Sequence, residues 1–167
     1  MSTSNTAQPT HALNVDKARF NMIEQQVRPW DVADSTVLGL LNDVPREAFT
    51  PEAYQSVAFA DLNVPLSTPP VEGESMLPPK VQARVAQDVA VEPTDTVLHI
   101  GTGSGFMAAL LGKQAKSVLS LEINPALTAV AKANLQRAGI TNVDVRCADA
   151  TAQGFKACEG QAPYDVI

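Results

Sequence analysis

Hydrophobic positions in the second half of the chain alternate between two patterns. Short apolar runs at 97–100, 118–122 and 143–147 are typical of strands, and the segments between them repeat apolar residues at helical spacing. A further run at 164–167 predicts the start of a fourth strand. Strands joined by single helices form parallel sheets with right-handed crossovers. The pattern therefore predicts an α/β fold built on a parallel sheet.

Each of the two crossover helices has a predicted buried face. The face of the first helix is predicted to comprise Phe106, Leu110 and Leu111. The second helix is expected to start at the Asn124 cap with Pro125 as its first residue, and to stop before Gly139. The buried stripe of this second helix is predicted to comprise Leu127, Val130 and Ala131.

The first 60 residues carry helical patterns with little apolar surface. A helix capped by Asp16 and ended by Pro29 is predicted to place on one face Phe20, Ile23 and Val27. A second helix, starting at Asp34 or Ser35, is predicted to bury Val37, Leu40, Leu41 and Val44, and a short third one is expected near 43–47. Such a lobe is too small to stand alone, so we expect it to dock on the rest of the chain.

Residues 62–79 lack a regular hydrophobic pattern, because five prolines and a glycine interrupt them. Prolines remove backbone donors and fix φ, so only short extended pieces are expected here. The segment is either a linker or an ordered functional loop, and the residues alone leave both interpretations open. Pro79 suits the first position of a helix whose inner face is predicted to comprise Val81, Val85 and Val89.

Composition narrows the class of protein. The 167 residues are 45% hydrophobic and carry a net charge of −6, which argues against a partner held by nucleic-acid phosphates. Two cysteines, Cys147 and Cys158, make neither a disulfide framework nor a metal site, and Cys147 is expected in or near the core. The chain shows no signal-peptide pattern and no bilayer-spanning apolar run, so we expect a cytoplasmic protein without membrane contact.

The candidate chemistry lies where the predicted strands end. Gly101, Gly103 and Gly105 follow the first strand and precede a helix, an order that lets a small ligand approach backbone N–H groups. Glu122 ends the second strand, where a carboxylate can accept both hydroxyls of a ribose. Asp149 follows the third strand and can hydrogen-bond an adenine amino group. The alternative is that the glycines form an ordinary tight connection.

Several motifs resemble the protein-L-isoaspartate O-methyltransferases, within the class I S-adenosylmethionine-dependent methyltransferases. The motifs stand at 43–51, at 58–66, in the glycine turn with Leu121-Glu122, at 142–149 and at 163–167. The resemblance implies a Rossmann-like fold with a seven-stranded sheet, of which this chain supplies the first half. The strand that opens at the last residues has no helix to cover its neighbours, so we expect the chain to be part of a longer protein. We predict three regions: a mobile tail at 1–15, a helical lobe with the substrate loop at 16–80, and a cofactor-binding domain at 81–167 that is incomplete at its C-terminus.

The resemblance implies S-adenosylmethionine as the cofactor. Gly101, Thr102, Gly103 and Gly105 would lie beside its methionine and ribose portions, Glu122 would hold the ribose hydroxyls, and Asp149 the adenine. His99 stands where the family carries an acidic residue that helps to hold the cofactor's amino group. Two interpretations of His99 remain open. Its neutral imidazole accepts one hydrogen bond from the cofactor, or it is a buried strand residue without contact to the cofactor.

The substrate loop departs further from the family pattern, which is of the Gly-Gln-Thr-Ile-Ser-Gln-Pro type. The aligned stretch is 73–79, in which Ser75 replaces the Thr and is the candidate catalytic residue, while Leu77 replaces the Ser and loses a hydroxyl. A polar acceptor group left unpaired there costs about 1–3 kcal/mol. The sequence thus favours cofactor binding more strongly than transfer to an isoaspartyl carboxylate.

Three functional hypotheses follow. The first is methyl transfer from S-adenosylmethionine to an isoaspartyl-containing protein or peptide, or to a related acceptor. The second is a non-catalytic S-adenosylmethionine-binding protein. The third, a nicotinamide-dependent oxidoreductase, is disfavoured because the turn reads G-x-G-x-G-F and lacks the last small residue of the dinucleotide fingerprint. The sequence predicts no metal site and leaves the oligomeric state open.

Overall fold

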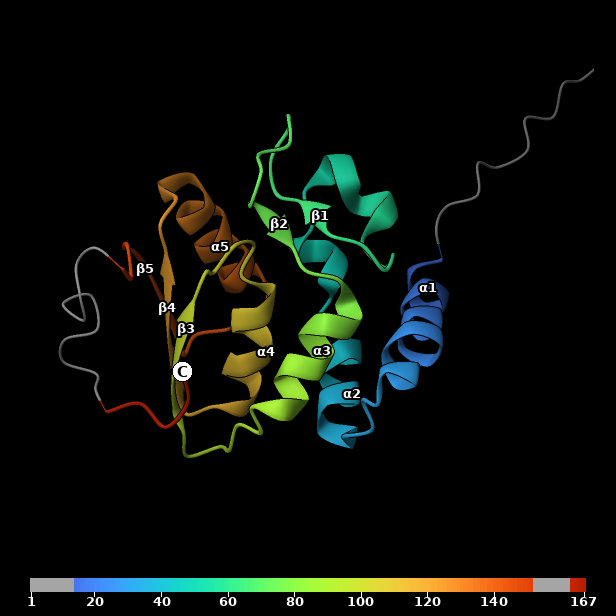
Figure 1. The fold of residues 1–167 in the computed structure, drawn as a ribbon, viewed down its shortest axis with the longest axis horizontal. Helices are drawn as coiled ribbons and strands as arrows, with labels where there is room; N and C mark the ends of the chain where they lie inside the picture. The colour runs from blue at the N-terminus through green and yellow to red at the C-terminus, as the bar shows by residue number, and fades with distance from the viewer. Residues whose placement is uncertain (1–13, 152–162) are drawn as a thin grey trace, which may run out of the picture.

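A computed structural model describes residues 14–151 and 163–167 of the chain. Its centre is a parallel sheet of β3 (Thr96–Ile100), β4 (Ser117–Glu122) and β5 (Val143–Cys147), in the order β3-β4-β5 (Figure 1). Beyond β3, Val166 forms a parallel bridge with Val97, and Leu98 N donates to Val166 O at 2.9 Å. The predicted α/β class, the parallel sheet and the start of a fourth strand are confirmed.

The two crossover helices are α4 (Phe106–Gln114) and α5 (Pro125–Arg137). The predicted face of α4 is buried, and Asn124 caps α5 by accepting from the backbone N–H groups of its first turn. The stripe predicted for α5 is wrong at one position, because Val130 is 47% exposed. The buried row of α5 is displaced around the helix and comprises Leu127, Thr128, Ala131, Asn134 and Leu135.

The N-terminal part is helical, as predicted. It comprises α1 (Val15–Met22), a π-helical turn (Ile23–Val27), a 3₁₀ turn (Arg28–Trp30), α2 (Ser35–Asp43) and two further 3₁₀ turns, Arg46–Phe49 and Glu52–Val57. The cap of α1 is Asn14 rather than Asp16, and the chain stays helical through Pro29. Phe20 is 62% exposed, so its predicted burial is wrong. The buried residues are Met22 at the end of α1, and Ile23 and Val27 in the π-helical turn.

The proline-rich segment forms only two short extended pieces, β1 (Val64–Pro65) and β2 (Ser75–Met76), which pair antiparallel. It leads into α3 (Pro79–Asp88), which begins at Pro79 as expected. The predicted inner face of α3 is wrong, because Val85 is 42% exposed. The buried residues of this helix are Pro79, Gln82, Ala83 and Ala86. Gln82 is buried because Arg46 donates a hydrogen bond to its side chain.

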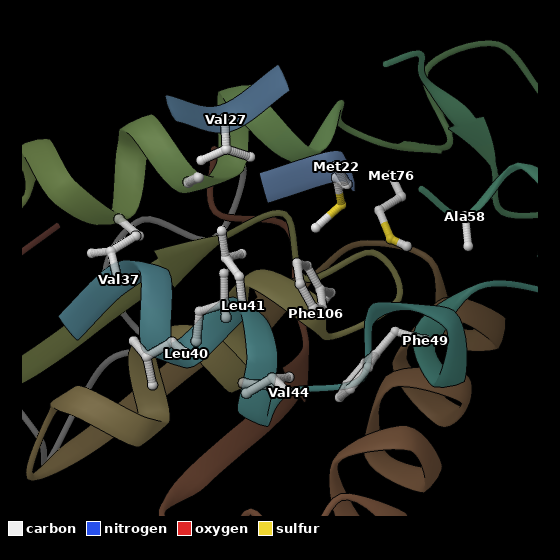
Figure 2. Close-up of a cluster of buried hydrophobic side chains, with 14 of the residues drawn as sticks. Met22, Val27, Val37, Leu40, Leu41, Val44, Phe49, Ala58, Met76 and Phe106 are labelled. Atoms are coloured by element: carbon white, nitrogen blue, oxygen red, sulfur yellow. The ribbon is translucent and has the colours of Figure 1, made fainter. Parts of the chain in front are cut away.

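One hydrophobic cluster joins the N-terminal helices to the sheet domain, which accounts for the expected docking. Figure 2 shows Met22 and Leu41 from the N-terminal helices beside Phe106, the first residue of α4. In Figure 1, α3 stands between α4 and the α1–α2 pair. Cys147 is exposed at the end of β5, so its expected place near the core is wrong.

Two expectations from the sequence concern residues that the structure does not describe. Residues 1–13 of the predicted tail, and Cys158, lie outside the described residues, and α1 already begins at Val15. None of the helices in the described ranges combines the length and hydropathy needed to cross a bilayer.

Candidate functional site

The glycine turn connects the end of β3 to the start of α4. Gly101, Gly103 and Gly105 have φ values of 87°, 55° and 89°, which side chains rarely allow. An added Cβ at Gly105 would also lie 3.3 Å from the carbonyl oxygen of Ala131 in α5. The backbone N–H of Gly101 donates to Leu121 O in β4 at 2.8 Å. The turn is therefore held against the neighbouring strand and the helix behind it.

Glu122 at the end of β4 supports the same turn. Its side chain is buried, and Oε2 accepts a hydrogen bond from Gly103 N at 2.8 Å, while Oε1 accepts from Asn124 N at 3.0 Å. Two backbone donors hold the carboxylate in one orientation. The end of β4 thus places an anionic acceptor directly beside the glycine turn.

A chain of three polar side chains lies under the turn. His99 Nδ1 and Ser120 Oγ are hydrogen-bonded at 2.9 Å, and Ser120 Oγ and Thr102 Oγ1 at 2.7 Å. Ser120 and Thr102 are buried and His99 is partly buried. Burial lowers the pKa of His99 to about 4, against the opposing effect of the Glu122 charge. His99 is therefore uncharged at neutral pH.

The proline-rich segment lies against this turn. The Leu66 side chain comes within 3.2 Å of the position that a Cβ on Gly103 would take. Further along, Asn124 Nδ2 donates to Glu74 Oε1 at 2.7 Å, which ties the segment to the start of α5. The sequence left open whether residues 62–79 form a linker or an ordered loop, and these contacts support an ordered loop over the site. We call residues 73–79 the acceptor loop.

A cavity of about 380 Å³ is lined by the acceptor loop, α3, β3, the glycine turn, α4 and the C-terminal residues 166–167. Its lining brings together most of the predicted site residues, namely Ser75, Leu77, His99, Gly101, Thr102 and Gly103. Leu77 is 46% exposed, so its side chain is not part of the core. Gly105, Glu122 and Asp149 do not line this cavity.

Asp149 lies at the end of β5, at the same edge of the sheet. Ala148 N donates to Glu122 O at 2.9 Å, so Asp149 follows directly on the residue that pairs with Glu122. Its Oδ1 accepts from the N–H and the hydroxyl of Thr151, at 2.8 and 2.7 Å. The predicted cofactor residues thus occupy the ends of three adjacent strands, where open α/β sheets bind ligands.

Sequence reasoning missed several residues that build the site. Ser120, Glu74, Asn124 as a side-chain donor, and Arg46 all contact partners distant in the chain. The one available signal was polar residues at positions whose neighbours are apolar, such as Ser120 within the β4 run. In residues 14–151 and 163–167, no group of three or more His, Cys, Asp or Glu side chains is arranged to hold a metal ion.

A parallel sheet with a glycine turn after its first strand and an acid after its second defines a Rossmann-like nucleotide-binding class. Residues 17–167 match the family described as Protein-L-isoaspartate(D-aspartate) O-methyltransferase (PCMT), and the chain belongs to this family.

Individual relatives agree with this assignment. The chain is 36% identical over 151 residues to a protein-L-isoaspartate O-methyltransferase of Methanoculleus marisnigri, covering 90% of this chain and 65% of that protein. A solved protein-L-isoaspartate O-methyltransferase superposes with a TM-score of 0.68 at 25% identity, covering 90% of this chain and 46% of the other.

A further solved structure, from Plasmodium falciparum in complex with S-adenosyl-L-homocysteine, shares the fold. Its TM-score is 0.59 at 19% identity, and the match covers 82% of this chain and 64% of the other. The chain spans less than two thirds of the length of the first curated relatives that it matches.

Proposed function

We propose that the protein binds S-adenosylmethionine at the glycine turn and transfers its methyl group to a carboxylate, with isoaspartyl-containing proteins or peptides as the acceptor class. The observation that carries this proposal is the hydrogen bond from Gly103 N to Glu122 Oε2 at 2.8 Å. This bond joins the glycine turn after β3 to the acid that ends β4. A nucleoside that carries an amino-acid group can bind both the backbone of such a turn and such a carboxylate.

The residues of the turn fit such a cofactor. Apart from Gly101 and its two chain neighbours, no residue has an atom within 4 Å of the position that a Cβ on Gly101 would take, so the turn is open on that side. Glu122 would hold the ribose hydroxyls and Asp149 the adenine. His99 is neutral, so it would offer a hydrogen bond to the amino-acid portion without a charge. Membership of the methyltransferase family supports these assignments.

The cofactor supplies a methyl group already activated by a sulfonium, and a carboxylate acceptor is already a nucleophile. The work of the protein is then to align the two groups and exclude water from them. The cavity between the acceptor loop and the glycine turn suits that task, and Ser75 offers a hydroxyl within it. This chemistry needs no general base, so His99 has no proton to remove.

Leu77 favours a second candidate function. Its side chain lines the cavity and offers no hydrogen bond to an acceptor carboxylate. A protein that binds the cofactor but methylates a different acceptor, or none, would fit that feature. Membership of the family supports a cytoplasmic place of action for either function.

Transfer of a radiolabelled methyl group tests the proposal. The protein is incubated with labelled S-adenosylmethionine and an isoaspartyl peptide, and the control is the same peptide with an ordinary aspartyl residue. We expect base-labile label on the isoaspartyl peptide alone, reduced in Ser75→Ala. Cofactor binding without label on the isoaspartyl peptide would exclude this acceptor and leave the second candidate function.

A further inference from the structure

Arg46 is buried where the N-terminal lobe, the acceptor loop and α3 meet. Its side chain is 1% exposed, yet three of its nitrogens donate hydrogen bonds. Nε donates to Ala58 O at 2.7 Å, Nη2 donates to Leu77 O at 2.7 Å, and Nη1 donates to Gln82 Oε1. The planar guanidinium thus binds the N-terminal lobe, the acceptor loop and α3 at once.

Within the described part of the chain, the guanidinium of Arg46 forms no ion pair with an acidic side chain. Burial accordingly lowers its pKa to about 10, which still leaves the guanidinium charged at neutral pH. Carbonyl dipoles and the face of the Phe106 ring, 5.1 Å from Arg46 Cζ, stabilise the cation instead. A buried cation is costly unless its donors are satisfied, so losing any one of these contacts is unfavourable.

The contact with Phe106 connects Arg46 to the glycine turn. Phe106 follows Gly105 directly as the first residue of α4, and its ring also meets that of Phe49 edge-on, at 5.6 Å between centroids. Figure 2 shows Phe49 and Phe106 within the same buried cluster. The guanidinium therefore touches both sides of the cavity: the acceptor loop through the Leu77 carbonyl, and the turn through Phe106.

We propose that Arg46 is the positioning residue that fixes the acceptor loop relative to the glycine turn. Arg46 does not line the cavity and acts through the backbone of Leu77, two residues beyond Ser75. This role deepens, and for catalysis rests on, the proposed methyl transfer. A lysine would keep the charge, but its compact ammonium cannot reach three acceptors in a plane.

Hydrogen exchange of the purified protein measures the position of the loop directly. In Arg46→Lys we expect the amides of the acceptor loop, residues 73–77, to exchange about tenfold faster or more, while those of α4 and β4 stay unchanged. The matched control is Arg19→Lys, another mostly buried arginine of the N-terminal lobe, which pairs with Glu47 and lies over Phe59. It should leave exchange in the loop unchanged. Equal loop exchange in Arg46→Lys and the unaltered protein would overturn the proposal.

A milder variant covers the case in which Arg46→Lys fails to fold. Gln82→Ala keeps the Arg46 charge and removes one of its three acceptors. Faster exchange confined to the loop would support the positioning role, and unchanged or uniformly faster exchange would overturn it.

Kinetics separate this role from a general effect on folding. At saturating cofactor we expect Arg46→Lys to lower kcat by about tenfold or more, with the Kd for S-adenosylhomocysteine within about twofold of the original. If Arg46→Lys speeds exchange in the loop but the unaltered protein transfers no methyl group, the proposed function is refuted and the positioning role stands. An active protein with unchanged kcat in Arg46→Lys would refute the positioning role alone.

Discussion

The side-chain amide of Asn124 donates a hydrogen bond to Glu74 Oε1 at 2.7 Å, which joins the acceptor loop to the end of β4. The backbone N–H of Asn124 donates to Glu122 at 3.0 Å, and its Oδ1 accepts from Ala126 N at 2.8 Å. Asn124 thus binds the loop carboxylate, orients Glu122, which is the predicted partner of the ribose hydroxyls, and caps α5.

Substitution of Asn124 should separate its cap from its link to the loop. Asn124→Ala removes both, and we expect the free energy of unfolding to fall by about 1–2 kcal/mol. Asn124→Ser keeps a capping oxygen but is too short to reach Glu74, so it should recover most of that loss. Urea denaturation checks this. Equal losses in the two variants would show that the cap contributes nothing.

Glu122→Ala should weaken binding of S-adenosylmethionine by about 1.5–3 kcal/mol, the range for hydrogen bonds to a charged group. The variant removes the carboxylate that meets Gly103 N and Asn124 N. Titration calorimetry measures the change, with Asp88→Ala as the control because Asp88 is an exposed carboxylate on α3 paired with Arg84. Unchanged affinity would remove Glu122 from the cofactor site.

Leu77→Ser should raise the rate on an isoaspartyl peptide. The added hydroxyl would donate to the acceptor carboxylate, and one such bond at the transition state is worth about ten- to a hundredfold in rate. Leu77 is 46% exposed, so the substitution removes little core packing. Methyl transfer at saturating cofactor is the measurement. If Leu77→Ser gains nothing, the missing hydroxyl does not limit this protein.

Because of His99, we expect the free energy of unfolding to fall in mild acid. Its pKa is lowered to about 4 in the folded protein, so the unfolded chain binds the proton first as the pH falls below its ordinary value of 6.5. The stabilisation is present above that value and shrinks by about 2 kcal/mol between pH 7 and pH 5. Urea denaturation of His99→Gln at both pH values should lack this component. Parallel pH dependence in the two proteins would contradict it.

The sequence predicted the elements of the fold better than their buried faces. The strands, both crossover helices and the glycine turn follow from periodicity and local capping, which are short-range properties. Val85 and Val130 were predicted to be buried and are exposed, because the neighbours that a helix meets decide which of its sides is covered. Gln82 is buried instead, since Arg46, 36 residues earlier, supplies its hydrogen bond.

In the site, too, the local residue types are predictable from the sequence and the long-range contacts are not. Glycines at alternate positions and an acid after the next strand carry a signal in the sequence, because a nucleotide-binding turn requires those residue types. The side chains that hold them together do not. Ser120 joins His99 to Thr102 from the neighbouring strand, and Glu74 reaches Asn124 across 50 residues. Only the folded chain brings these partners together.

Calorimetric titration of the protein with S-adenosylhomocysteine, beside an identical titration with NAD, tests the central claim most directly. We expect saturable binding of one S-adenosylhomocysteine per chain, lost or weakened in Glu122→Ala, and no heat of binding with NAD. Binding of NAD, or no binding of S-adenosylhomocysteine to the folded protein, would contradict the assignment of the glycine turn and Glu122 as an S-adenosylmethionine site.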